Sequence, residues 1–160
     1  MRMAHGVRTL TLALALALAL ALAPAVAGAC HLLPMRIASG VGKLGEVSVA
    51  FGAADDAQHP TAWQGPLRIT TGTAPACTVS DEVAIVEAPV VLGDGILYVP
   101  TYSGSNNRLY AVDTRSCRVL WRSRAFNGPT RLRHDRLTIG GRRVPLDREC
   151  RPAGMARDGR

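Results

Sequence analysis

Residues 93–121 read GDGILYVPTYSGSNNRLYAVDTRSCRVLW, and this stretch decides the fold. Residues 93–95 are typical of a tight turn, because Gly, and to a lesser degree Asp, tolerate the positive φ angles of short hairpins. Strand-like segments follow at residues 96–101 and 108–112, with a polar loop between them. A further turn at residues 113–116 leads into a third segment. The pattern therefore predicts three successive antiparallel strands.

The third segment has two different faces, because successive side chains of a strand point to opposite sides. One face carries Cys117, Val119, Trp121 and Ser123. The other face carries Arg118, Leu120, Arg122 and Arg124. We therefore expect one buried face, which includes Trp121, and one face in contact with solvent.

Three short motifs follow one another in this stretch. They are Leu97-Tyr98-Val99, Leu109-Tyr110-Ala111-Val112-Asp113 and Arg118-Val119-Leu120-Trp121. Their order resembles the repeat of quinoprotein-type (PQQ-like) β-propellers, over about 30 of the 160 residues. The resemblance implies one blade of a radial sheet assembly, in which the Asp opens a turn and the Trp packs between neighbouring blades.

The chain departs from the repeat at the turn and at the loop. Cys117 stands where the family usually has a turn glycine, Pro100 replaces a common glycine, and the loop at residues 101–107 is longer than usual. A complete propeller needs at least four blades of about 40 residues, so this chain caps its sheet differently or is a fragment of a larger propeller. Because the family's cofactor site needs a complete ring, the resemblance implies blade geometry and no cofactor.

Residues 1–29 have the three parts of a signal peptide. Arg2 and Arg8 precede an uncharged Leu and Ala run at residues 9–23, and small residues with A-x-A sites end the segment. A membrane span is the alternative, but it needs roughly 20 apolar residues. We predict export to a periplasm or outside the cell, with no transmembrane span after cleavage. Residues 30–150 then form one β domain, and residues 151–160 form a disordered tail.

Four cysteines lie at or beyond the cleavage site, at Cys30, Cys77, Cys117 and Cys150. When an exported chain has an even number of cysteines, they usually form disulfides with one another. We expect two disulfides and prefer Cys117–Cys150 with Cys30–Cys77, because each pair joins neighbouring predicted segments. The alternative is a lipid anchor on Cys30, because the small residues before it loosely satisfy the bacterial lipoprotein pattern.

Charge is unevenly distributed along the chain. Residues 30–100 contain 3 basic and 7 acidic residues, whereas residues 101–160 contain 14 basic and 5 acidic residues. Such a basic half is typical of proteins with anionic partners. With two Trp, three Tyr and two Phe, the chain has too few aromatic residues for the stacking platforms of single-strand binders. The composition therefore favours a solvated basic face or an anionic envelope polymer over nucleic acid.

Alternating patterns predict further strands on both sides of the central stretch. They lie at residues 46–51, 67–70, 77–79, 83–87, 89–92, 136–139 and 142–146. Gly140-Gly141 is a two-residue hairpin link. Residues 40–45 fit the dinucleotide-binding pattern G-x-G-x-x-G, but a strand pattern follows where that fingerprint requires a helix. We interpret them as a Gly-rich lead-in, and the fold class as mainly β, a small antiparallel domain with one propeller-blade-like meander after a signal-peptide helix.

No motif in the chain indicates catalysis or metal binding. There is no G-x-S-x-G or H-E-x-x-H, and the cysteines are too widely spaced for C-x-x-C chemistry. We assign no catalytic residue, metal ligand or cofactor, and no role to the histidines.

The predicted function is a non-enzymatic binding or interaction module of the bacterial cell envelope. Its partner is an envelope protein or an anionic envelope polymer. Aromatic and Arg side chains dominate binding hot spots, so the candidate binding residues are Tyr102, Arg118, Arg122 and Arg124. The alternatives are a small secreted hydrolase with a site built from loops, and an inhibitor that presents residues 101–107 to another secreted enzyme.

Mass spectrometry of the exported protein tests the predicted maturation. We expect loss of the first 27 or 29 residues and no diacylglyceryl group. A lipid-modified Cys30 would contradict the predicted disulfides, because the thioether would occupy that sulfur.

Overall fold

The computed structural model describes residues 29–133 and 135–155. The predicted signal-peptide helix, His134 and residues 156–160 of the predicted tail lie outside these ranges. Within them the protein consists of antiparallel β-sheets and contains no helix. The mainly β prediction is therefore confirmed, and export stays a prediction.

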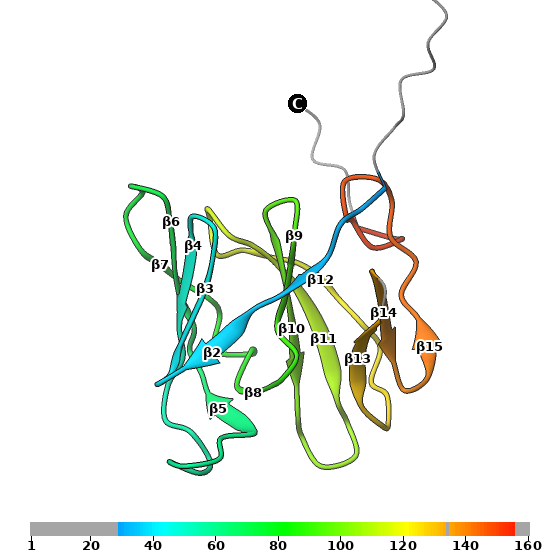
Figure 1. Ribbon diagram of the computed structural model, residues 1–160. Helices are drawn as coiled ribbons and strands as arrows, with labels where there is room; N and C mark the ends of the chain where they lie inside the picture. Colours follow the sequence, from blue (N-terminus) through cyan, green and yellow to red (C-terminus); the bar gives the residue numbers. More distant parts are fainter. Residues whose placement is uncertain (1–28, 134, 156–160) are drawn as a thin grey trace, which may run out of the picture.

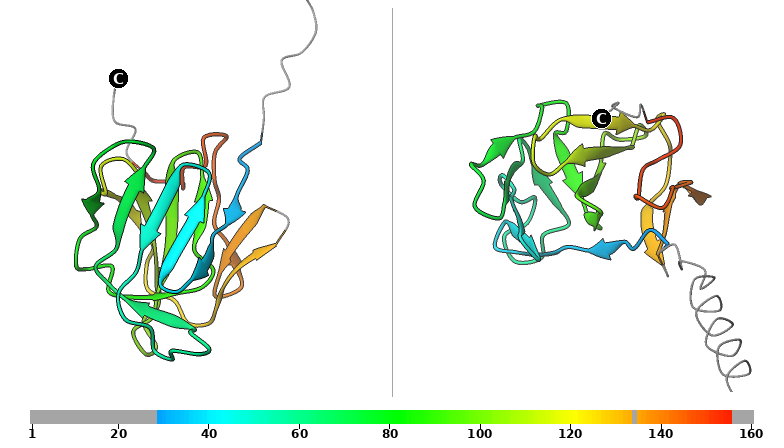
Figure 2. Two further views of the ribbon diagram at one scale, coloured as in Figure 1. Left: turned by 60° about the vertical axis from the view of Figure 1, so that its left-hand side comes forward. Right: turned by 90° about the horizontal axis from the view of Figure 1, so that it is seen from above.

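Three sheets are stacked as layers, with the largest in the middle (Figure 1). The seven strands of the central sheet are β1 (Leu33–Pro34), β5 (Ala62–Gln64), β8 (Ile85–Glu87), β9 (Val91–Gly93), β10 (Ile96–Thr101), β11 (Arg108–Asp113) and β12 (Val119–Arg122). The five-stranded sheet contains β2 (Arg36–Ala38), β3 (Val41–Leu44), β4 (Val47–Ala50), β6 (Arg68–Thr71) and β7 (Cys77–Thr78). The three-stranded sheet contains β13 (Thr130–Arg133), β14 (Arg136–Ile139) and β15 (Arg142–Arg143). From above, the five-stranded sheet (cyan) and the three-stranded sheet (orange) lie on opposite sides of the central strands (Figure 2).

The meander β9 to β12 forms as the sequence predicts. Gly93 pairs with Ile96, so Asp94 and Gly95 alone make the turn, with φ angles of 47° and 74°. β10 then pairs along its whole length with β11, and β11 pairs with β12. The three strands predicted in this stretch are confirmed.

Strand β10 is buried at every residue, because its two faces contact different hydrophobic cores. Leu97 and Val99 point into the first core, which also contains Val49 and Ile69 of the five-stranded sheet. The alternate residues of β10 point the other way. There Ile96 and Tyr98 belong to the second core, together with Leu137 of the three-stranded sheet, Val144 and Cys150.

A β-bulge in β12 changes the face on which Trp121 lies. Val112 pairs with Val119 but Ala111 pairs with Trp121, which leaves Leu120 without a partner. One extra residue reverses the alternation beyond it. Val119 therefore packs against the first core and Trp121 against the second. The prediction of a buried Trp121 on the same face as Val119 is wrong, because the side chain is half-buried and lies on the opposite face.

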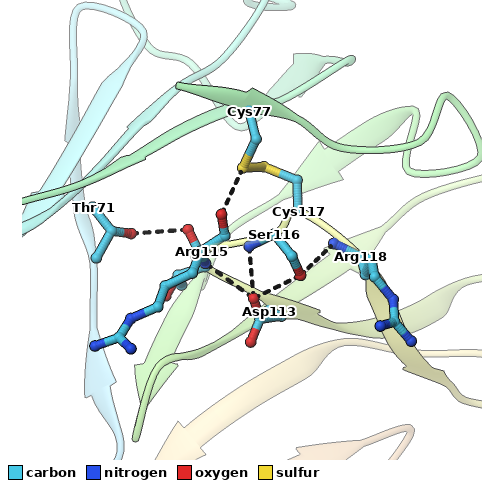
Figure 3. Close-up of a disulfide and its surroundings, with 8 residues drawn as sticks. Thr71, Cys77, Asp113, Arg115, Ser116, Cys117 and Arg118 are labelled. Carbon is cyan, nitrogen blue, oxygen red and sulfur yellow. Dashed lines mark hydrogen bonds between the residues drawn. A yellow bond between two sulfur atoms is a disulfide. The ribbon is translucent and has the colours of Figure 1, made fainter. Parts of the chain in front are cut away.

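The two disulfides join Cys30 to Cys150 and Cys77 to Cys117. Two disulfides were expected, but the preferred pairing of Cys117 with Cys150 and Cys30 with Cys77 is wrong. That pairing assumed that segments near in sequence are near in space. Stacking of the sheets instead places the β6–β7 edge of the five-stranded sheet beside the β11–β12 turn, and the beginning of the domain beside its end (Figures 1 and 3).

Two other regions differ from the sequence prediction. Residues 41–44 of the G-x-G-x-x-G motif form strand β3, with Gly40 and Gly45 in turns at φ angles of 72° and 57°. The motif is therefore two hairpin turns and a strand, and not a lead-in. Residues 151–155, predicted as part of a disordered tail, are held in place, since Pro152 is buried and bridges to Leu146.

Five strands were not predicted, namely β1, β2, β3, β5 and β13. They are short, from two to four residues, and have no clear alternation of their own. Pairing with neighbouring strands, which the sequence does not display, places them in their sheets.

Peptide mapping under non-reducing conditions tests the disulfides. We expect one linked peptide pair containing Cys30 with Cys150, and another containing Cys77 with Cys117. In the chain-entropy model the two closed loops contribute about 5 and about 4 kcal/mol to the free energy of unfolding. A Cys30–Cys77 peptide would contradict the stacking order of the sheets, because it would require the β6–β7 edge of the five-stranded sheet to approach the beginning of the domain.

Candidate functional site

A cleft of about 500 Å³ opens between the end of β12 and the three-stranded sheet. This volume is in the range of small-ligand sites. The cleft, which we call the arginine cleft, is lined by Trp121, Ser123, Arg124, Ala125, Phe126, Asn127, Ile139, Gly140, Arg142, Arg143, Val144 and Pro145.

Aromatic and aliphatic side chains give the arginine cleft its apolar surface. The bulge in β12 turns Trp121 toward this side of the central sheet. Phe126 is fixed by two backbone hydrogen bonds with Asn107, of 2.9 and 3.1 Å. Ile139 and Val144 complete the apolar part. A half-exposed indole that lines the same cleft as a second aromatic ring suits an apolar group of a partner.

Three exposed arginines, Arg124, Arg142 and Arg143, line the same cleft. None of the described residues that line the cleft is acidic, so none of them supplies a carboxylate that neutralises these guanidinium groups. Arginine binds carboxylate and phosphate groups through a planar fork of N–H donors. The arrangement therefore favours a ligand with an anionic group next to an apolar one.

The turn Gly140-Gly141 sets the position of Arg142. Ile139 pairs with Arg142 across this turn, and both glycines have positive φ angles of 52° and 78°. A Cβ atom on Gly140 would lie 2.5 Å from the backbone oxygen of Asn127. Glycine is therefore required here both by conformation and by the close approach of residue 127, which itself lines the cleft.

The four predicted binding residues do not form one site. Arg124 lines the arginine cleft. Tyr102 is 46% exposed and lines a separate hollow with Glu82 and Ile85. Arg122 pairs with Glu82 at the edge of that hollow, at 3.2 Å. Arg118 lies at the start of β12, beyond the β11–β12 turn.

Sequence reasoning missed four contributors to the cleft, Trp121, Phe126, Arg142 and Arg143. The bulge that turns Trp121 into the cleft has no local sequence signal. The Gly-Gly hairpin was recognised, and it was the one signal that placed Arg142 opposite Ile139. The sequence of the hairpin did not show which part of the protein the hairpin packs against.

The described histidines lie in exposed regions. Nδ1 of His31 lies 3.4 Å from a carboxylate oxygen of Asp135. The backbone N–H of His59 donates to the Asp56 side chain, in a loop where Asp55 also accepts several hydrogen bonds. Hydrogen bonds from Thr61 and nearby backbone groups hold the pKa of Asp55 below its ordinary value. These contacts order the loop and bring no histidine to a nucleophile.

The turn between β11 and β12 is organised by Asp113 (Figure 3). Its side chain accepts hydrogen bonds from the backbone N–H groups of Arg115 and Ser116, at 3.1 and 2.7 Å, and from the Ser116 hydroxyl at 2.7 Å. The hydroxyl of Thr71, in the five-stranded sheet, donates to the backbone oxygen of Thr114 at 2.8 Å. The turn therefore connects two sheets beside the Cys77–Cys117 disulfide.

The hydrogen bonds in this turn determine the charge state of Asp113. Burial raises the pKa of this carboxyl, but the bonds from Ser116 and Arg115 outweigh burial and hold the pKa below its ordinary value of 3.8. A folded-state pKa below the unfolded one means that the ionised turn stabilises the fold. This stabilisation is complete above the unfolded pKa and is lost as the pH falls through the folded one.

No protein-family model matches the chain, and comparison with curated proteins found no match. No helix in residues 29–133 and 135–155 is long and apolar enough to cross a membrane. Within the same residues, no group of three or more His, Cys, Asp or Glu side chains is arranged to hold a metal ion.

Replacing Asp113 by Ala tests the turn. We expect the free energy of unfolding to fall by about 1 kcal/mol at pH 7, because hydrogen bonds to a charged acceptor are lost at a partly exposed site. The difference from the wild type should shrink as the pH falls from about 4, the unfolded pKa, through the lower folded pKa of Asp113. Urea unfolding over this pH range measures both effects.

Asp81→Ala is the matched control, since Asp81 is an exposed carboxylate for which the described residues show no hydrogen bond. Its unfolding free energy should stay within about 0.5 kcal/mol of the wild type. Equal losses in both variants, or a loss for Asp113→Ala that does not change with pH, would contradict this role of the Asp113 carboxylate.

Proposed function

We propose that the protein is an exported, non-enzymatic binding module of the bacterial cell envelope, and that the arginine cleft is its binding site. One observation carries the proposal. Arg124, Arg142 and Arg143 line a cleft that contains exposed aromatic surface and no carboxylate. The partner is an envelope protein or an anionic envelope polymer that presents a carboxylate or phosphate beside an apolar group.

Two features support an exported module. The sequence of residues 1–29 has the parts of a signal peptide, and all four cysteines are in disulfides. Disulfides persist in oxidising compartments such as a periplasm or the cell exterior. The disulfide at Cys30 uses the sulfur atom that a lipid anchor would require.

The blade-like character of β9 to β12 is part of this proposal. Cys117 has a φ of 58°, a conformation that favours glycine. This supports the resemblance to the propeller repeat, in which a glycine usually occupies this turn position. The stacking of antiparallel sheets face to face on both sides of the meander also suits a blade. The disulfide with Cys77 gives the cysteine at this position a structural role.

A binding module is better supported than a hydrolase. Among the residues that the structure describes, no His, Cys, Asp or Glu lines the arginine cleft, so this lining offers no general base or activated nucleophile. An inhibitor that presents residues 101–107 has the exposed Tyr102 in its favour. That loop lacks the concave, charged surface of the cleft.

The affinity of the double variant Arg124→Gln/Arg142→Gln for its partner tests the proposal. Loss of hydrogen bonds to a charged partner costs about 1.5–3 kcal/mol, so affinity should fall about tenfold or more. A pull-down from envelope extract identifies the partner, and titration with that purified partner gives the affinity. Acrylamide quenching of Trp fluorescence should fall on binding, because Trp121 lines the cleft whereas Trp63 is buried in the free protein.

Arg36→Gln/Arg68→Gln is the matched control. It removes the same charge from exposed positions on the five-stranded sheet. We expect its affinity to be close to that of the wild type. Equal weakening by both pairs would show that net charge and not the cleft binds the partner. Turnover of a hydrolase substrate that is lost in His59→Ala or His134→Ala would replace the binding module by the enzyme alternative.

A further inference from the structure

The outer face of the three-stranded sheet carries four arginines. In its register Arg133 pairs with Arg136, and Arg131 and Arg143 both pair with Thr138. Paired residues of neighbouring strands point to the same side. Leu132 and Leu137 alternate with these residues and pack against the second core, so the arginines point away from it. We call Arg131, Arg133, Arg136 and Arg143 the arginine face.

All four side chains of the arginine face are exposed. The described residues show no ion pair between any of them and a carboxylate. Asp135, the acidic residue of the same hairpin, lies instead 3.4 Å from Nδ1 of His31. The guanidinium groups are therefore free to meet an external anion.

The register places like charges directly opposite each other. Cβ atoms of opposite residues in an antiparallel pair lie about 4.5–5.5 Å apart, and like charges at this separation destabilise the pair. Repulsion between Arg133 and Arg136 therefore lowers the stability of the β13–β14 hairpin. A partner with negative charges would turn this repulsion into attraction.

The three-stranded sheet, which carries the arginine face, lies on one side of the central sheet (Figures 1 and 2). Strands are separated by about 4.8 Å, and residues two apart along a strand by about 7 Å, so the charges form a two-dimensional array. Arg143 also lines the arginine cleft, but the other three arginines of the face line neither this cleft nor the hollow beside Tyr102. A linear polymer is usually held in a groove, whereas this array extends over three strands of a sheet and suits an extended charged surface.

We propose that the arginine face docks the domain on the surface of an anionic phospholipid membrane, with the arginines bound to lipid phosphate groups. Arginine forks bind phosphate in a bidentate manner, and clusters of four or more basic residues are typical of anionic-lipid binding. No large apolar or aromatic side chain is part of the face, so the contact is electrostatic and peripheral. The same lack of aromatic rings gives nucleic-acid bases nothing to stack on.

The contact between His31 and Asp135 places the first described residues beside the tip of the β13–β14 hairpin. The inference does not depend on what the arginine cleft binds.

Vesicle co-sedimentation of the purified exported protein tests the proposal. We expect binding to vesicles that mix phosphatidylglycerol with phosphatidylcholine, and no binding to phosphatidylcholine alone. Each basic residue near an anionic surface contributes about 1 kcal/mol, so Arg133→Gln/Arg136→Gln should lower the partition coefficient about thirtyfold. Binding should also weaken steeply as salt is added, because exposed charges are screened.

The matched control is Arg36→Gln/Lys43→Gln. These two residues are also an exposed cross-strand pair of like charge, in the five-stranded sheet. The control should bind anionic vesicles like the wild type. Equal losses in the two pairs would overturn the proposal, because net charge alone would then explain binding. Binding to neutral vesicles at the same level would overturn it as well.

Two further measurements complete the test. The melting temperature of Arg133→Gln/Arg136→Gln should equal or exceed that of the wild type, because a like-charge pair is removed. A lower melting temperature would contradict the repulsion on which the inference rests. Polyphosphate and RNA are used as soluble competitors, and tighter binding to either than to anionic vesicles would replace the membrane by a polymer partner.

Discussion

The structure depends on the need to cover both faces of the central sheet. β10 is buried at every residue, and its alternate side chains enter two separate cores. Each core needs a second layer of side chains, which the five-stranded sheet supplies on one face and the three-stranded sheet on the other. Tyr98 shows how completely this interior excludes water. Its hydroxyl donates to the backbone oxygen of Cys150, and burial raises its pKa.

The covalent and polar links lie where the sheets meet. The Cys77–Cys117 bond and the hydrogen bond from Thr71 to Thr114 connect the five-stranded sheet to the central sheet at the β11–β12 turn. The Cys30–Cys150 bond joins the two ends of the domain next to the second core. Disulfides of this kind are common in small exported domains, whose cores bury a modest share of the chain's surface.

This arrangement of sheets places the basic side chains of the C-terminal half on distinct surfaces. Arg124 and Arg142 line the cleft beside the second core, and Arg131, Arg133 and Arg136 are held on the outer side of the three-stranded sheet. Arg143 belongs to both surfaces. The hairpin β14–β15 contributes to both surfaces, because successive residues of a strand point to opposite sides. A module with a membrane-facing side and a lateral cleft would hold its partner close to the envelope surface.

The sequence by itself determined the β class, the meander from Gly93 to Trp121 and the hairpin at Gly140-Gly141. These depend on alternation and on two-residue turns, which are encoded by residues adjacent in the chain. The tertiary structure alone decided the disulfide pairing, the face occupied by Trp121 and the existence of the arginine cleft. Each of these requires contacts between segments far apart in the chain, and for Trp121 a bulge that arises from pairing with β11.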